Sequence, residues 1–136
     1  MKEDAIFYVG QKAFIYKEDQ VLVLKGNFKG LDYPGGKIQE GETDLKESLK
    51  REVREETGLE IIVEDPFSTW ATVFPDNHRL GGKRLFLVGY KCKYISGEVT
   101  LSNEHDSFLW VDKKNYVSLD DKSSYFEILK KYFLNK

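Results

Sequence analysis

Apolar residues alternate with polar ones over several stretches of the chain, and β-branched and aromatic residues are frequent in these stretches. Such runs predict strands. The predicted strands span residues 6–16, 21–25, 59–63, 69–74, 83–94 and 108–111. Polar or glycine-containing segments separate them, so residues 17–20 predict a turn, residues 26–32 a loop, and residues 75–82 a hairpin loop.

One internal stretch shows helical spacing instead. Between residues 44 and 57, three apolar residues form a single arc at about 100° per residue. They are Leu45, Leu49 and Val53. Asp44 or Thr43 can cap the start of this helix, and Gly58 can close its end.

A second helix is predicted from Tyr125 to Leu134, at the end of the chain. Phe126, Leu129 and Phe133 share one face of it, whereas Ile128 lies off that face. Mixed strands with one internal and one terminal helix indicate an α+β or α/β fold.

The internal helix carries three glutamates, and the direction in which they point decides how they are interpreted. Charged helices are most often solvated faces with (i, i+4) pairs, and Arg51 and Glu55 make such a pair. However, Glu52 and Glu56 fall inside or beside the apolar arc, and Glu55 lies at its margin. Clustered inward carboxylates repel one another unless they are protonated, paired or bound to a cation. Three oxygen donors at i, i+3 and i+4 suit Mg²⁺ or Mn²⁺.

A glycine turn, Pro34-Gly35-Gly36, lies upstream of this helix. Glycine lets the backbone come close to a ligand, so a carbonyl of this turn could complete a metal shell and its amides could meet a phosphate oxygen. Such a tripeptide alone is usually only a turn. When Gly41-Glu42 and the carboxylate helix follow it, the combined pattern is much more specific for a metal or phosphate site than the turn alone.

Residues 36–59 resemble the signature of the Nudix hydrolases. That signature reads Gly, five residues, Glu, seven residues, then Arg-Glu-aliphatic-any-Glu-Glu-any-Gly-aliphatic. Gly36 and Glu42 have the expected separation, and residues 51–59 match the second half throughout. Eight residues rather than seven separate Glu42 from Arg51. We place the extra residue near Thr43, which keeps the helix register but would shift the contact of Glu42 with the helix.

The resemblance implies an α/β/α sandwich with a central mixed sheet, formed by residues 1–136 as a single Nudix hydrolase domain. It implies Mg²⁺-dependent hydrolysis of the phosphoanhydride bond in a nucleoside diphosphate linked to another group. Nucleoside triphosphates, dinucleoside polyphosphates, ADP-ribose and nucleotide sugars are all open as substrates. The implied metal ligands are Glu52, Glu55, Glu56 and the carbonyl of Gly36. They would hold one to three Mg²⁺ ions, with Mn²⁺ as the alternative ion.

The resemblance also implies the catalytic residues. Arg51 would orient the glutamates by ion pairing, and the general base would be a helix glutamate such as Glu55 or an acid from a separate loop. Residues 101–112 resemble the Glu-His-x-x-x-x-Trp stretch found late in several Nudix enzymes, which makes Glu104 the loop candidate. The alternatives are a plain loop acid for Glu104, a loop or capping role for His105, and a core position for Trp110.

Residues outside the signature would choose the substrate. Aromatic side chains could stack on a base, and cations could meet phosphates. The candidates in the two loops are Phe28, Lys29, Tyr33, Phe74, His78, Arg79 and Arg84. Each by itself is better explained by packing or by a solvated charge, so none is assigned as a binding residue.

Composition narrows the functional classes. The chain has 136 residues, one cysteine and a net charge of −2. Cys92 is expected to be a buried thiol, and the absence of a basic surplus makes nucleic-acid binding unlikely. No signal-peptide pattern or membrane-length apolar run is present, so a cytoplasmic protein is expected. The resemblance allows a homodimer.

Two alternatives belong to other functional classes. A regulatory module with a retired site would be expected to lack one of the helix glutamates, and none is missing. Isopentenyl diphosphate isomerisation on the same fold would need further cysteine and acid residues, which a lone Cys92 does not provide. RNA 5′-end hydrolysis remains possible as a substrate subclass.

Overall fold

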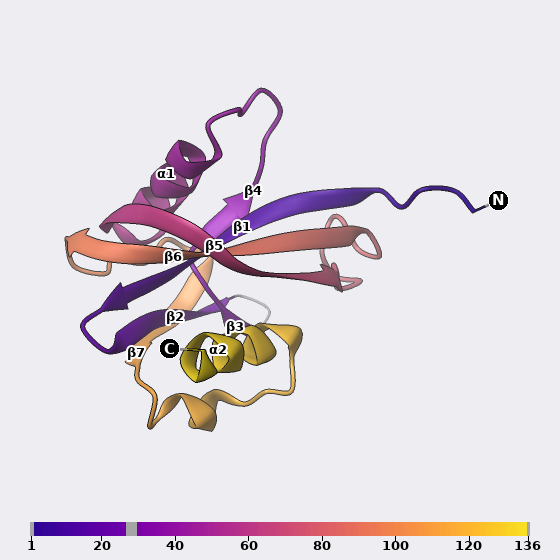
Figure 1. The fold of residues 1–136 in the computed structure, drawn as a ribbon. Helices are drawn as coiled ribbons and strands as arrows, with labels where there is room; N and C mark the ends of the chain where they lie inside the picture. Colours follow the sequence, from indigo (N-terminus) through magenta and orange to yellow (C-terminus); the bar gives the residue numbers. More distant parts are fainter. Residues whose placement is uncertain (1, 27–29, 136) are drawn as a thin grey trace.

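The computed structural model describes residues 2–26 and 30–135. In this part of the chain, seven strands form one mixed sheet that lies between two helices (Figure 1). The strands are β1 (Phe7–Lys17), β2 (Gln20–Gly26), β3 (Leu31–Asp32), β4 (Gly35–Lys37), β5 (Glu60–Val73), β6 (Arg84–Ser96) and β7 (His105–Val111). The helices are α1 (Leu45–Thr57), the short 3₁₀ helix η1 (Tyr116–Leu119) and α2 (Ser124–Leu134). The predicted α/β/α sandwich with a mixed central sheet is confirmed.

Strand β1 belongs to two parts of the sheet. The main strand order is β3-β2-β1-β6-β5, while β4 pairs with β1 and β7 pairs with β2. β1 runs parallel to β6 and antiparallel to β2 and β4. It pairs with β2 only at residues 16–17 and with β4 at residues 10–12. β2 and β4 therefore diverge from the same edge of β1 and leave an opening in the sheet between them.

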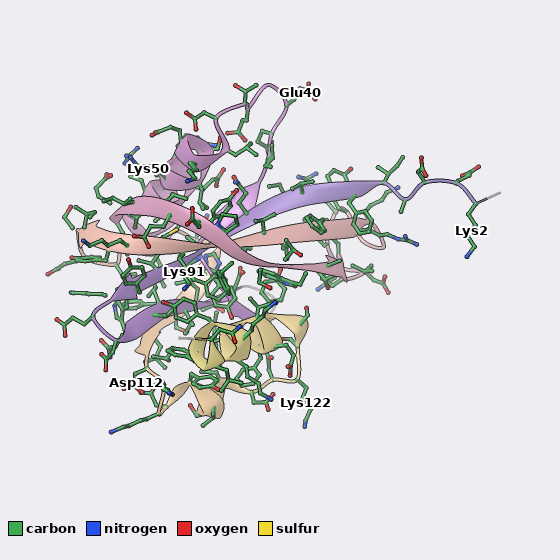
Figure 2. All side chains as sticks on the ribbon, in the orientation of Figure 1. Lys2, Glu40, Lys50, Lys91, Asp112 and Lys122 are labelled. Atoms are coloured by element: carbon green, nitrogen blue, oxygen red, sulfur yellow. The ribbon has the colours of Figure 1, made fainter. Side chains whose placement is uncertain are left out.

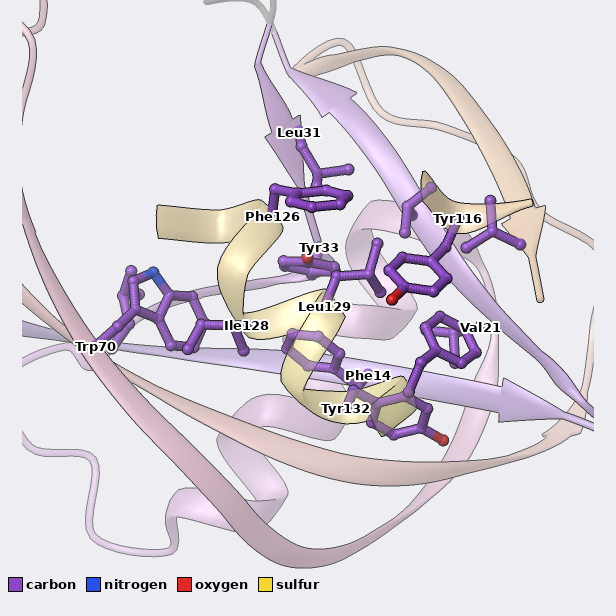
Figure 3. Packing of buried hydrophobic residues seen from close by; sticks show 14 of the residues in the cluster. Phe14, Val21, Leu31, Tyr33, Trp70, Tyr116, Phe126, Ile128, Leu129 and Tyr132 are labelled. Carbon is purple, nitrogen blue, oxygen red and sulfur yellow. The ribbon is translucent and has the colours of Figure 1, made fainter. Parts of the chain in front are cut away.

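The alternation of β1 side chains explains the two layers of core. Ala13 and Ile15 face α1, whereas Phe14 belongs to the cluster on the α2 side. On the α2 side, Phe14 stacks against both Tyr33 and Tyr132, with ring centroids 4.1 and 5.9 Å apart (Figure 3). Charged side chains such as those of Lys2, Glu40 and Lys122 lie at the periphery (Figure 2).

Helix α1 is the predicted internal helix. The Asp44 side chain caps it by accepting a hydrogen bond from the Glu47 N–H at 3.2 Å, and Gly58 ends it with a φ of 76°. Leu49 and Val53 are fully buried against the sheet. The apolar arc therefore faces the core, as the spacing of its residues predicts.

Three predictions about elements need correction. The predicted strands 59–63 and 69–74 are one edge strand, β5, whose register shifts on both sides of Pro66. Proline lacks an N–H for the ladder, so the pairing with β6 is irregular there and the pattern of strand-forming residues is interrupted. Ile128 is buried, because α2 presents a broad apolar face to the sheet and η1. The last strand, β7, starts at His105 rather than at Phe108.

Other predictions hold. Cys92 is fully buried, and burial raises the pKa of its thiol to about 12. Trp110 is half-buried against the core on the α1 side. No described helix is both long enough and apolar enough to cross a membrane.

Candidate active site

The glycine turn and the carboxylate helix meet directly. The Gly35 N–H donates a hydrogen bond of 2.7 Å to Oε1 of Glu56. A Cβ at Gly35 would lie 1.9 Å from the Gln11 carbonyl oxygen, and one at Gly36 would lie 2.7 Å from Oε2 of Glu52. A side chain at Gly35 would collide with the backbone of β1, so only glycine fits there, whereas one at Gly36 would displace the Glu52 carboxylate. The two glycines therefore allow β4 to lie between β1 and the glutamates of α1.

Arg51 holds three carboxylates together. Its Nη1 donates to both oxygens of Glu55, at 3.0 and 3.2 Å. Its Nη2 donates to Glu42 at 2.9 Å and to Glu52 at 3.1 Å. Glu42 also accepts from the Gln39 N–H at 2.7 Å. The contact of Glu42 with the helix is therefore retained despite the additional residue, which the loop accommodates.

A second cluster includes Glu56 but neither of the other two signature glutamates. One potential ligand atom from each of Glu56, Glu104 and His105 lies within 4.8 Å of the other two. The segment before β7 delivers Glu104 to this position, because the Ser102 N–H donates to the Glu56 carbonyl at 3.1 Å. Helix α1 and the segment before β7, which are distant in the sequence, therefore meet at Glu56.

The environment of Glu56 shifts its titration. Burial raises the pKa of Glu56 to about 7, and a hydrogen bond with Glu104 also raises it. The charge of Lys12, the Gly35 N–H and the charge of His105 oppose this shift. A carboxyl group that titrates near neutrality inside a cavity is typical of functional sites.

A partly buried charged cluster, in which the side chain of Lys12 is 13% and that of Asp32 24% exposed, borders the site at the opening in the sheet. Lys12 Nζ lies 2.9 Å from Oδ1 of Asp32, and His105 Nε2 lies 3.0 Å from Oδ2. Burial opposes ionisation of Asp32, but the Lys12 charge and the hydrogen bonds outweigh it and lower its pKa to about 2. His105 is 8% exposed. It is thus a buried strand residue, and the expected loop or capping role is wrong.

Two adjoining cavities open at this site. The polar one has a volume of about 450 Å³, and the apolar one about 310 Å³. The polar cavity is lined by Gly26, Asp32, Lys37, Glu56, Asn77, His78, Arg79, Glu104 and His105. The apolar cavity shares Gly26, Asp32 and His78 with it and is also lined by aromatic and aliphatic residues, including Leu31, Phe74, Leu85 and Tyr125.

The candidate substrate residues separate into groups. Phe74 and His78 stack at 4.6 Å on the wall of the apolar cavity, and Arg79 lines the polar one. Tyr33 is fully buried and donates its hydroxyl proton to the Tyr125 carbonyl at 2.7 Å, so it is a core residue.

Arg84 lies over the Phe7 ring and lines neither cavity. Phe28 and Lys29 lie outside the described residues.

Some residues at the site were not anticipated. Lys12 and Asp32 carry no sequence signal, because only the divergence of β2 and β4 brings them to His105. Lys37 directly follows the Gly-Gly pair inside the signature segment, and this position could have identified it as a residue of the site. Tyr125 reaches the apolar cavity from the first turn of α2, and Asp121 reaches it from the loop before that helix.

Comparison with known proteins agrees with this architecture. The sequence profile of the NUDIX domain matches residues 8–132. The nucleoside triphosphatase NudI of Klebsiella pneumoniae subsp. pneumoniae is 32% identical over 101 residues, which cover 68% of this chain and 71% of that protein. The crystal structure of the MutT protein from Methanosarcina mazei Go1 is 25% identical, with a TM-score of 0.80 over 98% of this chain and 97% of that one. A mutator MutT protein from Bacillus halodurans is 27% identical, with a TM-score of 0.69 over 91% and 80% of the two chains. The chain belongs to the Nudix hydrolase family and is an enzyme of the pyrophosphohydrolase type.

Proposed function

We propose that this protein hydrolyses the phosphoanhydride bond of a nucleoside triphosphate or a related linked nucleoside diphosphate, with Mg²⁺ as cofactor. The observation that carries this proposal is the buried Glu56, which faces Glu104 in a polar cavity that continues into an apolar one. The nucleoside triphosphatase name of the Klebsiella relative supports the same substrate group.

The residues at the site fit a divalent cation. Glu56 and Glu104 lie close enough to share a hydrogen bond, an arrangement that is costly when both are ionised. Nδ1 of His105 is buried and has no hydrogen-bond partner among the described residues. Carboxylate and carbonyl oxygens are the donors that Mg²⁺ prefers, and Mn²⁺ accepts them too. The carboxylate donors therefore favour a bound Mg²⁺ or Mn²⁺ ion, and the unpartnered His105 nitrogen leaves a polar group free beside them.

We propose that Glu52, Glu55, Glu56 and the Gly36 carbonyl hold one to three Mg²⁺ ions. Bound Mg²⁺ neutralises phosphate charge and favours attack by water. Glu56 has the strongest support, because its burial makes an isolated charge costly. Glu55 accepts hydrogen bonds from Arg51 in this structure and would exchange them for the cation.

Arg51 is proposed to position these carboxylates rather than to contact the substrate. Its two terminal nitrogens donate to Glu42, Glu52 and Glu55. Because a guanidinium donates in a fixed planar fork, it can hold several carboxylates in one arrangement. Loss of Arg51 should therefore loosen the carboxylate cluster as a whole.

Glu104 is proposed as the general base. A water oxygen forms a bond to phosphorus while the bridging P–O bond breaks, and the water proton passes to the carboxylate. Glu104 faces the polar cavity beside Glu56, whereas Glu55 is exposed and does not line that cavity. These positions favour Glu104 over the alternative base Glu55.

The apolar cavity is proposed to hold the nucleoside. The stacked rings of Phe74 and His78 form an aromatic wall, and Leu85 and Tyr125 line the same cavity. Aromatic and aliphatic walls suit a planar base. Since His78 also lines the polar cavity, a nucleoside there has its phosphates directed toward Glu56.

The proposal is tested by measuring phosphate and pyrophosphate release from nucleoside triphosphates, dinucleoside polyphosphates, ADP-ribose and nucleotide sugars. Wild-type protein, Glu56→Gln and Glu47→Gln are compared with and without Mg²⁺. Glu47 is an exposed α1 residue and serves as the matched control. We expect Mg²⁺-dependent release that falls at least about 100-fold in Glu56→Gln only. No release from any substrate class, or equal turnover in both variants, would refute the proposal.

A further inference from the structure

Two cations line the polar cavity together with the carboxylates. Lys37 is the last residue of β4, and Arg79 belongs to the loop between β5 and β6. In the described part of the chain, neither side chain forms an ion pair with a carboxylate. Lys37 instead lies over the Phe74 ring, with its Nζ 5.7 Å from the ring centroid.

Lys37 and Arg79 line the same polar cavity and the same outer groove, so their two positive charges share one region of the surface. Bringing two like charges together without an anion is unfavourable, and a phosphate would remove that repulsion. The pair therefore matches an anionic ligand.

The position of the pair indicates which part of a ligand it meets. Lys37 and Arg79 line not only the polar cavity but also an outer groove of about 480 Å³, whose other residues include Phe7, Tyr8 and Ile38. His78 lines the junction with the apolar cavity. The polar cavity that contains Glu56 thus adjoins the apolar cavity and also the outer groove, and the two cations lie where it meets the outer groove.

We propose that Lys37 and Arg79 form a clamp for the terminal phosphate of a nucleoside triphosphate. This inference rests on the proposed function, because it requires the nucleoside in the apolar cavity and the scissile bond beside Glu56. Phosphates beyond that bond then reach the cation pair. A free terminal phosphate carries up to two negative charges and three acceptor oxygens, whereas an esterified phosphate carries one charge. The clamp therefore selects triphosphates over diphosphates linked to a sugar.

Binding of inorganic tripolyphosphate tests the clamp without turnover. Calorimetric titration in EDTA compares wild type with Arg79→Gln, Lys37→Gln and the control Lys83→Gln. Lys83 is exposed, lies outside both cavities and the outer groove, and has the same charge as the clamp residues. We expect the dissociation constant to rise about tenfold or more in the two clamp variants and to change less than about twofold in the control. Equal weakening in all three variants, or none in the clamp variants, overturns the clamp.

Turnover tests the substrate class. Arg79→Gln should lower kcat/KM for ATP about tenfold or more, and for ADP-ribose less than about threefold. Equal losses for the two substrates would overturn selection of the free terminal phosphate. If wild type hydrolyses no substrate while the tripolyphosphate titration behaves as expected, the proposed function fails but the anion clamp stands.

Discussion

His105 Nε2 lies 3.0 Å from Oδ2 of Asp32, so the first residue of β7 is joined to the end of β3. The other oxygen of Asp32 contacts Lys12 at 2.9 Å, and the Tyr33 N–H also donates to it at 2.8 Å. This carboxylate therefore connects three strands at the opening in the sheet. Because Glu104 directly precedes His105, the same contact helps to set the backbone position of the proposed base.

Replacing Asp32 by Asn should destabilise the fold by about 3 kcal/mol, because it leaves the largely buried Lys12 charge without its carboxylate. Urea unfolding followed by circular dichroism measures the change. The exposed Asp65→Asn on the edge strand is the control and should change stability by less than about 0.5 kcal/mol. Equal effects of the two substitutions would show that the Lys12–Asp32 pair adds no more to the free energy of unfolding than an exposed carboxylate does.

Glu56 makes stability depend on pH in a defined direction. Its pKa in the folded protein, about 7, is above the ordinary value of 4.5, so between these pH values the folded state binds more protons than the unfolded state. Stability of the metal-free protein should therefore fall as pH rises through this range, by on the order of 1–3 kcal/mol. Urea unfolding at several pH values in EDTA measures the change. Glu56→Gln should lose this part of the pH dependence, and an unchanged profile in the variant would contradict the assignment.

Glu104→Gln should reduce kcat by about 100-fold or more while changing KM little, since the amide cannot accept the proton from water. Steady-state kinetics over a range of pH measures both constants on the best substrate of the release assay. Asp106→Asn, an exposed acid two residues away, is the matched control. If Glu104→Gln keeps both the rate and the pH–rate profile of wild type, the base role returns to Glu55.

Gly36→Ala should weaken divalent cation binding several-fold with little loss of stability. The new Cβ would lie 2.7 Å from the Glu52 carboxylate, which is the end of a side chain and can move away. Mn²⁺ titration followed by electron paramagnetic resonance reports the affinity directly. Gly30→Ala is the control, because a Cβ there meets no atom within 4 Å. Unchanged Mn²⁺ affinity in Gly36→Ala would indicate that Glu52 is not a ligand.

The helix and its glutamates were accessible from the sequence because they depend on local rules. The spacing of Leu49 and Val53 places Glu56 on the inward face, and the capping residue and Gly58 define the ends of α1. The Nudix resemblance extended this local pattern to the sandwich, because a specific signature implies the fold around it. The pairing of β5 with β6 joins residues that are distant in the sequence, and no local pattern indicates it. The single edge strand β5 was therefore predicted as two strands on either side of the irregularity at Pro66.

The remaining part of the site depends on tertiary structure. Some residues of the site lie far apart in the sequence and carry opposite charges. They meet only where β2 and β4 diverge from β1, and they include Lys12, Asp32 and His105. The sequence alone determined the carboxylate helix, since helical periodicity acts over a few residues. Tertiary packing decided which groups face those carboxylates, because burial and charge interactions depend on distance in space rather than on separation along the chain.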